Sequence, residues 1–136
     1  MFCIPGEKEL EDPMSTKKKV AIVTGGASGI GFAFTRSLAD AGYAVVIADM
    51  AGADEAANRL KGEGFDVIGV KADVANVDDT NAMVAAAVDN FGGLDLLVNN
   101  AGIFTSLKLK PFDQIEPAEW MKVMEVNTLG PFLCAK

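Results

Sequence analysis

Three closely spaced glycines near the start of the chain could bind a phosphate group. Gly25, Gly29 and Gly31 separate the apolar segment 20–23 from a helical pattern that begins near Ile30. A glycine-rich turn that opens a helix directs free N–H groups and the positive end of the helix dipole to one point, which favours an anion. The spacing differs from the common G-x-G-x-x-G pattern, so the prediction also depends on the flanking strand and helix. The alternative interpretation is that these glycines only turn the chain and bind nothing.

An aspartate at the end of the next apolar segment indicates which phosphate-bearing ligand to expect. Asp49 follows the unbroken apolar run 44–48. In a nucleotide-binding fold, a carboxylate at that place can accept hydrogen bonds from both ribose hydroxyls of an adenosine and repels a 2′-phosphate, so it favours NAD over NADP. No arginine stands in 26–28 or directly after Asp49 to reverse this preference. The alternative interpretation is that Asp49 only forms a turn.

Two further apolar segments end in polar residues. Asp73-Val74 follows the third segment, and Asn99-Asn100-Ala101-Gly102 follows the fourth. An asparagine at a strand end can hold neighbouring backbones together through its amide, and Ala101-Gly102 lets a flat ligand approach the main chain. Either segment could instead be an ordinary start of a loop.

Short apolar runs alternate with helical patterns along the chain, and these elements must position the polar residues. The predicted strands are 20–24, 44–48, 65–70 and 94–98, and the predicted helices are 30–41, 54–60, 77–91 and 116 to the chain end. A strand followed by a helix, repeated four times along the chain, is typical of a parallel sheet with right-handed crossovers. We therefore expect an α/β fold: a Rossmann-type doubly wound sheet in three αβα layers, with strand order 3-2-1-4 and incomplete at its C-terminal side.

The apolar residues of two helices predict which faces pack on the sheet. In the first helix they are Ile30, Phe34, Leu38 and Ala41. In the third helix they are Val77, Val84, Val88 and Phe91. In the last helix, Gly130-Pro131 predicts a bend.

Composition excludes several classes of function. The 136 residues carry a formal net charge of −7 and include no histidine, so binding to nucleic acid or an acidic membrane surface has no electrostatic support. No apolar run is long enough to span a membrane. Cys3 and Cys134 form no disulfide framework and no metal-ligand spacing, so we expect no metal site and a cytoplasmic location. Residues 1–16 are predicted to be a flexible leader, and 17–136 a dinucleotide-binding domain.

Taken together, the motifs resemble the short-chain dehydrogenase/reductase family. In chain order they are Thr24-Gly25-x-x-x-Gly29-x-Gly31, Asp49, Asp73-Val74, the segment 94–102 and Val126-Asn127. The resemblance extends over nearly the whole chain, from about Lys18 to Lys136, and the ordered motifs make it specific. The chain is similar to the N-terminal, NAD-binding half of such an enzyme.

The resemblance implies roles for twelve residues in or beside these motifs. The pyrophosphate and the adenosine ribose would be surrounded by Gly25, Ser28, Gly29, Ile30 and Gly31. Asp49 would bind the ribose hydroxyls, and Asp73 and Val74 would contact the adenine edge. The inner ribose would lie against Asn100, Ala101 and Gly102. Asn127 would help to hold a water molecule in the family's proton relay. Asn127 shares a helical face with Trp120, Met124 and Pro131. Its alternative role is therefore structural, as a buried amide that hydrogen-bonds within the core.

The residues that carry out the family's reaction are missing from the sequence. That reaction needs a tyrosine, a lysine four residues later that lowers the pKa of the tyrosine, and a serine from the preceding strand. Tyr43 is the only tyrosine, and Ile47 stands four residues after it. Ser106 lies in the loop after Gly102, so it is not the family serine. We therefore expect a chain truncated before the catalytic segment.

Two hypotheses follow for the function. In the first, the chain is the cofactor-binding half of a longer NAD-dependent oxidoreductase that acts on a small-molecule alcohol or carbonyl compound and forms a homo-oligomer. In the second, it is a catalytically inactive dinucleotide-binding fragment, or an interaction module that uses the exposed edge of its fourth strand. A methyl-donor-dependent transferase would share the glycine turn and Asp49 but would not explain 99–102 together with Asn127.

Overall fold

The computed structural model describes residues 17–104 and 106–136, so the predicted leader, 1–16, lies outside the described residues. The strands are β1 (Val20–Thr24), β2 (Ala44–Asp49), β3 (Val67–Lys71) and β4 (Leu96–Val98). The α-helices are α1 (Gly29–Asp40), α2 (Ala53–Gly62), α3 (Val77–Phe91), α4 (Pro117–Met124) and α5 (Gly130–Ala135). A 3-10 turn, η1 (Phe112–Gln114), precedes α4, and a π-helical stretch, η2 (Glu125–Leu129), follows it.

The four strands form one parallel sheet in the order β3-β2-β1-β4, which confirms the predicted order. β1 pairs with β2 from Val20 opposite Ala44 to Thr24 opposite Ala48. On its other side, β1 pairs with β4. Since all strands run in one direction, the polar residues that follow β1, β2 and β4 meet at the same edge of the sheet.

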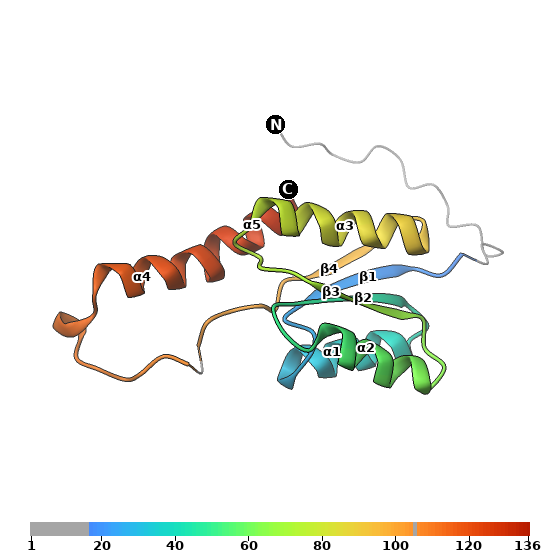
Figure 1. Ribbon diagram of the computed structural model, residues 1–136, viewed down its shortest axis with the longest axis horizontal. Helices are drawn as coiled ribbons and strands as arrows, with labels where there is room; N and C mark the ends of the chain where they lie inside the picture. Colours follow the sequence, from blue (N-terminus) through green and yellow to red (C-terminus); the bar gives the residue numbers. More distant parts are fainter. Residues whose placement is uncertain (1–16, 105) are drawn as a thin grey trace.

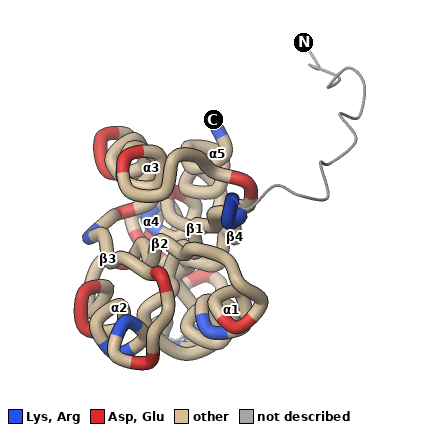
Figure 2. Tube along the Cα trace, turned by 90° about the vertical axis from the view of Figure 1, so that its right-hand side faces the viewer, with Lys and Arg blue, Asp and Glu red and all other residues tan. Residues whose placement is uncertain are grey.

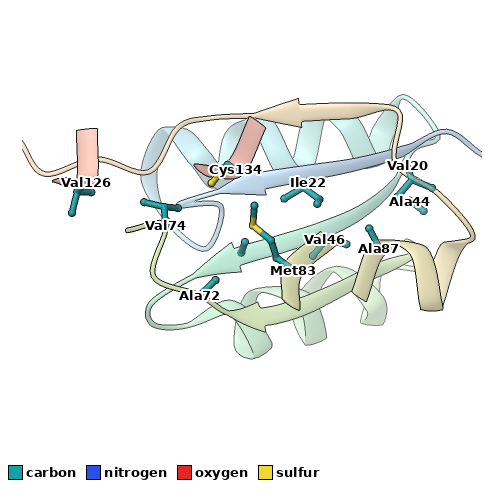
Figure 3. Close-up of a cluster of buried hydrophobic side chains, with 11 residues drawn as sticks. Val20, Ile22, Ala44, Val46, Ala72, Val74, Met83, Ala87, Val126 and Cys134 are labelled. Carbon is teal, nitrogen blue, oxygen red and sulfur yellow. The ribbon is translucent and has the colours of Figure 1, made fainter. Parts of the chain in front are cut away.

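Helices cover both faces of the sheet (Figure 1): α1 and α2 lie on one face, α3 and α5 on the other. β2 contributes to both apolar layers because successive side chains of a strand point to opposite faces. Val46 belongs to the layer under α3 and α5, whereas Val45 and Ile47 belong to the layer under α1 and α2. Figure 3 shows Met83 of α3 and Cys134 of α5 in the first of these layers.

The buried face of α1 differs from the predicted one. Ile30 and Phe34 are 73% and 45% exposed, and the residues that α1 buries are Gly31, Thr35 and Ala39. These residues are small, and a Cβ at Gly31 would overlap the carbonyl oxygen of Gly25, so this face of the helix has no room for a large side chain. The helical period was predicted correctly, and Leu38 packs against the core as a half-buried side chain as predicted, but the buried positions predicted for Ile30 and Phe34 were wrong.

The buried face of α3 is also only partly as predicted. Val77 and Val88 are exposed, and the residues buried along this helix are Thr80, Met83 and Ala87. Val84 and Phe91 pack against the core as half-buried side chains. Asn76 caps the helix, because its Oδ1 accepts hydrogen bonds from the N–H groups of Asp78 and Asp79.

Two strands begin later than predicted, at Val67 and Leu96. The N–H of Phe65 donates to the carbonyl of Leu60 and so closes the end of α2 instead of pairing in the sheet. Before β4, the carboxylate of Asp95 accepts a hydrogen bond of 2.7 Å from the N–H of Val20. Both strand starts are therefore set by hydrogen bonds that hydrophobicity does not reveal.

The C-terminal helix runs from α4 through η2 into α5, and η2 ends directly before Gly130 and Pro131. Pro131 has no N–H to donate to the carbonyl of Asn127, so the regular i to i+4 pattern cannot continue there. The predicted irregularity at Gly130-Pro131 therefore takes the form of a π-helical stretch. α4 extends away from the sheet (Figure 1), and none of its residues is buried.

Cys134 of α5 is a buried thiol in the layer under α3. Burial raises the pKa of this thiol because the thiolate is disfavoured away from water. The neutral thiol thus contributes stability below the pKa of an unfolded cysteine, about 8.5, and this contribution is lost as pH rises through the higher folded value.

We expect Cys134 to react slowly with thiol reagents in the folded chain. In a Cys3→Ser variant, where Cys134 is the remaining cysteine, the reaction at pH 8 should be at least about tenfold slower without urea than in urea. The rate of colour release by an aromatic disulfide reagent measures this. Equal rates under the two conditions would contradict the buried position of the thiol.

Candidate functional site

The glycine turn leads from the carboxyl end of β1 directly into α1. Gly25 and Gly29 have φ values of +63° and +54°, a region that favours glycine. Ser28 is the N-cap of α1, and its side chain makes no capping hydrogen bond, so the first N–H groups of the helix have no side-chain acceptor. A Cβ at Gly29 would meet no atom within 4 Å. Open space and uncapped N–H groups therefore coincide, which is the arrangement that an anion needs.

Gly25 and Gly31 differ from Gly29, because neighbouring atoms leave no room for a Cβ at either position. A Cβ at Gly25 would lie 2.9 Å from the Cα of Ala101. A Cβ at Gly31 would overlap the carbonyl oxygen of Gly25 and would lie 2.5 Å from the Nδ2 of Asn100. These two glycines let the turn, the start of α1 and the segment after β4 touch one another.

Asn100 fastens the glycine turn to the end of β4. Its Nδ2 donates to the carbonyl oxygens of Thr24 and Gly25, at 3.0 and 3.1 Å. Thr24 Oγ1 in turn accepts hydrogen bonds of 3.1 Å from the N–H groups of Asn100 and Ala101. The predicted residues 100 and 101 are therefore brought against the predicted turn, and the amide of Asn100 serves to hold its shape.

Two threonines support the turn, and neither was among the residues predicted for the site. Thr24 is buried, and its hydroxyl donates to the carbonyl of Val98 at 3.3 Å. Thr35 of α1 is fully buried, and its hydroxyl donates to the carbonyl of Gly26 at 3.1 Å. A hydroxyl residue that ends an apolar strand directly before a glycine turn is the signal that could have identified Thr24. The role of Thr35 depends on the helix face, which the sequence did not reveal.

Asp49 lies at the tip of β2 and contacts the same turn. Its Oδ2 accepts a hydrogen bond of 3.1 Å from the N–H of Ala27, and its Oδ1 accepts one of 3.3 Å from the N–H of Ala51. The side chain is half-buried. Since a carboxylate oxygen can accept more than one hydrogen bond, these contacts leave acceptor capacity for a ligand. Asp49 thus takes part in the turn structure and lies where a ribose-binding carboxylate was predicted.

Asp73 and Val74 follow β3 in different surroundings. The Oδ1 of Asp73 accepts a hydrogen bond of 2.9 Å from the N–H of Ala75. Val74 is buried in the layer shown in Figure 3, and a Cβ at Gly130 would lie 2.7 Å from its Cγ2. The side chain of Val74 therefore belongs to the core between β3 and α5. Only the backbone of Val74 is left for the contact with adenine that was predicted for it.

Asn127 lies in η2 and holds the loop that follows β4. Its Oδ1 accepts a hydrogen bond of 2.7 Å from the N–H of Ile103, and its Nδ2 donates to the carbonyl of Ile103 at 3.0 Å. The residue is exposed, as are Trp120 and Met124, so the alternative role as a buried amide in an apolar stripe is wrong. A Cβ at Gly102 would lie 3.3 Å from the Oδ1 of Asn127. Asn127 is thus in contact with the segment that carries predicted residue Gly102.

The remaining candidates for chemistry do not join this site. Tyr43 directly precedes β2, at the opposite end of the strand from Asp49. Ser106 is exposed in the loop after β4. In 17–104 and 106–136, no group of three or more His, Cys, Asp or Glu side chains could hold a metal ion. The helices of these same ranges include none with the length and apolar character to cross a membrane.

Comparison with known proteins agrees with this arrangement. The family model described as short chain dehydrogenase matches residues 19–136. A cis-4-hydroxycyclohexanecarboxylate dehydrogenase from Sinomonas cyclohexanicum is 43% identical over 120 residues, which cover 88% of this chain and 47% of the relative. A 3-oxoacyl-(acyl-carrier-protein) reductase from Staphylococcus aureus is 38% identical over 120 residues, which cover 85% of this chain and 47% of that protein.

A solved structure extends the similarity to three dimensions. The crystal structure of a 3-ketoacyl-(acyl-carrier-protein) reductase from Brucella melitensis, complexed with NADH, matches with a TM-score of 0.77 and 38% sequence identity. The match covers 88% of this chain and 48% of that one, so the chain spans about half the length of these relatives. The family match, the sheet order and the placement of the glycine turn together show that the chain belongs to the short-chain dehydrogenase family.

Proposed function

We propose that this chain binds NAD(H) where the glycine turn, Asp49 and the segment 100–102 meet, and that the whole protein is an oxidoreductase. Its reaction would transfer a hydride between the nicotinamide and an alcohol or carbonyl compound. The observation that carries the proposal is the open space at Gly29 beside the uncapped start of α1, with the Asp49 carboxylate bonded to the same turn. The NADH in the Brucella melitensis reductase supports a nicotinamide dinucleotide.

Each part of the site has a separate task toward such a ligand. The N–H groups at the start of α1 would hold the pyrophosphate, and Gly29 leaves the space for it. Asp49 would accept hydrogen bonds from the ribose hydroxyls and would repel a 2′-phosphate, so NAD is favoured over NADP. The Asp73 carboxylate would lie beside the adenine edge, and the main chain of 100–102 beside the inner ribose.

The nicotinamide, when bound, supplies the carbon that accepts or releases the hydride. Toward this chemistry the chain contributes position: Asn127 holds Ile103 through two hydrogen bonds and so fixes the loop next to Gly102. In the whole protein, Asn127 would also help to hold the water of the proton relay. The tyrosine and lysine that exchange the proton in this family have no counterpart among the 136 residues of this chain. The proposal of catalysis therefore concerns the whole protein.

An Asp49→Ala variant should bind NADH about tenfold more weakly and should lose most of its discrimination against NADPH. The change removes the acceptor for the ribose hydroxyls and the charge that repels a 2′-phosphate. Titration with NADH and NADPH, followed by the fluorescence of the reduced nicotinamide, gives both dissociation constants. Asp66→Ala is a matched control, because Asp66 is an exposed carboxylate in an ion pair with Lys18 near the other end of the sheet. An unchanged NADH to NADPH ratio in Asp49→Ala would contradict the assignment.

The alternative is that the 136-residue chain binds a dinucleotide without catalysis. The position of its single tyrosine favours this alternative for the chain taken alone. Tyr43 lies at the amino end of β2, away from Asp49. We expect the purified chain to bind NADH and to show no NAD-dependent oxidation across a panel of alcohols. Turnover by a preparation whose mass spectrum contains only the 136-residue chain would overturn this alternative.

A further inference from the structure

The helix that carries Asn127 widens directly before Pro131. The N–H of Glu125, at the end of α4, donates to the carbonyl of Met121, four residues back, as in a regular α-helix. The N–H of Gly130, at the end of η2, donates to the carbonyl of Glu125, five residues back. This turn of the helix therefore contains one extra residue. We call η2 with its extra residue the widened turn.

Pro131 accounts for the widened turn. In a regular α-helix, its ring would collide with the carbonyl of Asn127, four residues earlier, and it has no N–H to donate to that carbonyl. An extra residue moves this carbonyl away from the ring. The nearest donor before the ring, the N–H of Gly130, then bonds to Glu125. The bulk of the ring and the missing N–H therefore act in the same direction.

The part of the helix that follows the widened turn is held in one rotation by the core. α5 lies beside α3 on one face of the sheet (Figures 1 and 2). Val126, Gly130 and Cys134 follow one another at intervals of four residues, and all three are buried. A Cβ at Gly130 would lie 2.7 Å from the Cγ2 of Val74, so only the glycine side of α5 fits there. The core thus sets the direction from which the widened turn is measured.

The extra residue changes the direction of Asn127. Each residue of an α-helix turns the chain by about 100°, so one extra residue turns the segment before it by about this angle relative to α5. Asn127 lies in the middle of the widened turn and is rotated by about half as much. A rotation of this size moves the polar end of a side chain out of hydrogen-bond range. The two bonds of Asn127 to Ile103, at 2.7 and 3.0 Å, therefore depend on the widened turn.

We propose that Pro131 is a positioning residue of the cofactor site. It widens the helix, the widened turn directs Asn127 at Ile103, and this contact holds the main chain next to Gly102. A Cβ at Gly102 would lie 3.3 Å from the Oδ1 of Asn127, so the support reaches the segment proposed to lie beside the inner ribose. The effect on the cofactor rests on the proposed NAD function, whereas the effect on the helix does not. Pro131 acts through Asn127 and needs no contact with the cofactor.

Scalar couplings across hydrogen bonds, measured by NMR, test the helix directly, because an N–H group couples to the carbonyl carbon that accepts it. In the wild-type chain, the N–H of Gly130 should couple to the carbonyl carbon of Glu125, and the N–H of Ile103 to the Cγ of Asn127. Pro131→Ala restores the N–H and removes the ring. In this variant Gly130 should couple to the carbonyl four residues back, and the coupling between Ile103 and Asn127 should be lost. A coupling of Gly130 to Glu125 that persists would overturn the proposal.

Titration with NADH, followed by the fluorescence of the reduced nicotinamide, tests whether Pro131 acts through Asn127. Pro131→Ala should bind NADH about fivefold more weakly, as expected when a hydrogen-bonded support is lost. Asn127→Ala should show a similar loss. The double variant should bind as well as either single variant, because both changes remove the same contact. Losses that multiply to about 25-fold in the double variant would mean that the two residues act independently and would overturn the proposal.

Pro117→Ala is the matched control. Pro117 is also a helical proline, but it stands at the first residue of α4, where an N–H has no partner within the helix. The variant should keep both couplings and the wild-type affinity for NADH. An equal loss of affinity in Pro117→Ala and Pro131→Ala would overturn the role of Pro131.

Two further arrangements keep the test decisive. Where circular dichroism shows that Pro131→Ala does not fold, Pro131→Ser, which also restores the N–H, takes its place. A wild-type chain that does not bind NADH would overturn the proposed function, and the coupling partner of Gly130 would still decide whether Pro131 widens the helix.

Discussion

Replacing Gly29 with alanine should weaken NADH binding by at least about tenfold while the chain stays folded. A Cβ at this position would meet no protein atom within 4 Å, so the cost to folding is limited to the φ of +54°, about 1 kcal/mol for alanine. The same methyl group would occupy the open space in front of the first N–H groups of α1, where the pyrophosphate is proposed to lie. Fluorescence titration with NADH, together with thermal unfolding, measures the two effects separately.

Gly42→Ala is the matched control for this variant. Gly42 follows the other end of α1, has a φ of +89°, and would likewise have no atom within 4 Å of an added Cβ. The two variants should therefore lose similar amounts of stability, and only Gly29→Ala should lose affinity for NADH. Retained affinity in Gly29→Ala, or an equal loss in both variants, would contradict the role proposed for the glycine turn.

An Asn100→Asp variant should reduce the free energy of unfolding by about 2–4 kcal/mol and should also weaken NADH binding. The amide of Asn100 donates to the carbonyl oxygens of Thr24 and Gly25 at 3.0 and 3.1 Å. A carboxylate of the same shape has no proton to donate when ionised, so it would place negative charge against two acceptors. Urea denaturation followed by far-UV circular dichroism gives the change in stability.

Asn99→Asp makes the same chemical change at the neighbouring position. Asn99 is exposed, and an exposed substitution of this kind should alter the free energy of unfolding by no more than about 0.5 kcal/mol. The pair of variants therefore separates the effect of added charge from the loss of the bridge between β4 and the turn. Similar destabilisation in the two variants would show that the bridge is not what stabilises this edge of the sheet.

The arrangement of the strands could be predicted from the sequence because it depends on patterns that the sequence contains directly. The apolar run 44–48 predicts a strand covered on both faces, and β2 is that strand. The alternation of strands with helices leaves few topologies open, so the order 3-2-1-4 and the meeting of Asp49 with the glycine turn follow. Residue type and position along the chain were sufficient for these features.

The features that could not be predicted depend on which way side chains point once the elements have packed. Ile30 and Phe34 have the spacing of a buried stripe, yet the residues that α1 buries are the small Gly31, Thr35 and Ala39. Arg59 follows Asp49 by ten residues in the sequence, and only the packing of α2 beside α1 brings it to Phe32 and Ser28. Hydrophobic periodicity carries no information on such contacts between neighbouring helices.

The hydrogen bonds of Asn100 to the glycine turn join residues that are 76 and 75 positions apart in the chain. Closing so long a loop costs conformational entropy before any contact is gained. During synthesis, a nascent chain that ends before Asn100 would already contain the three glycines, α1 and Asp49, but not the amide that holds the turn in shape. The turn would therefore gain this support only when β4 takes its place beside β1.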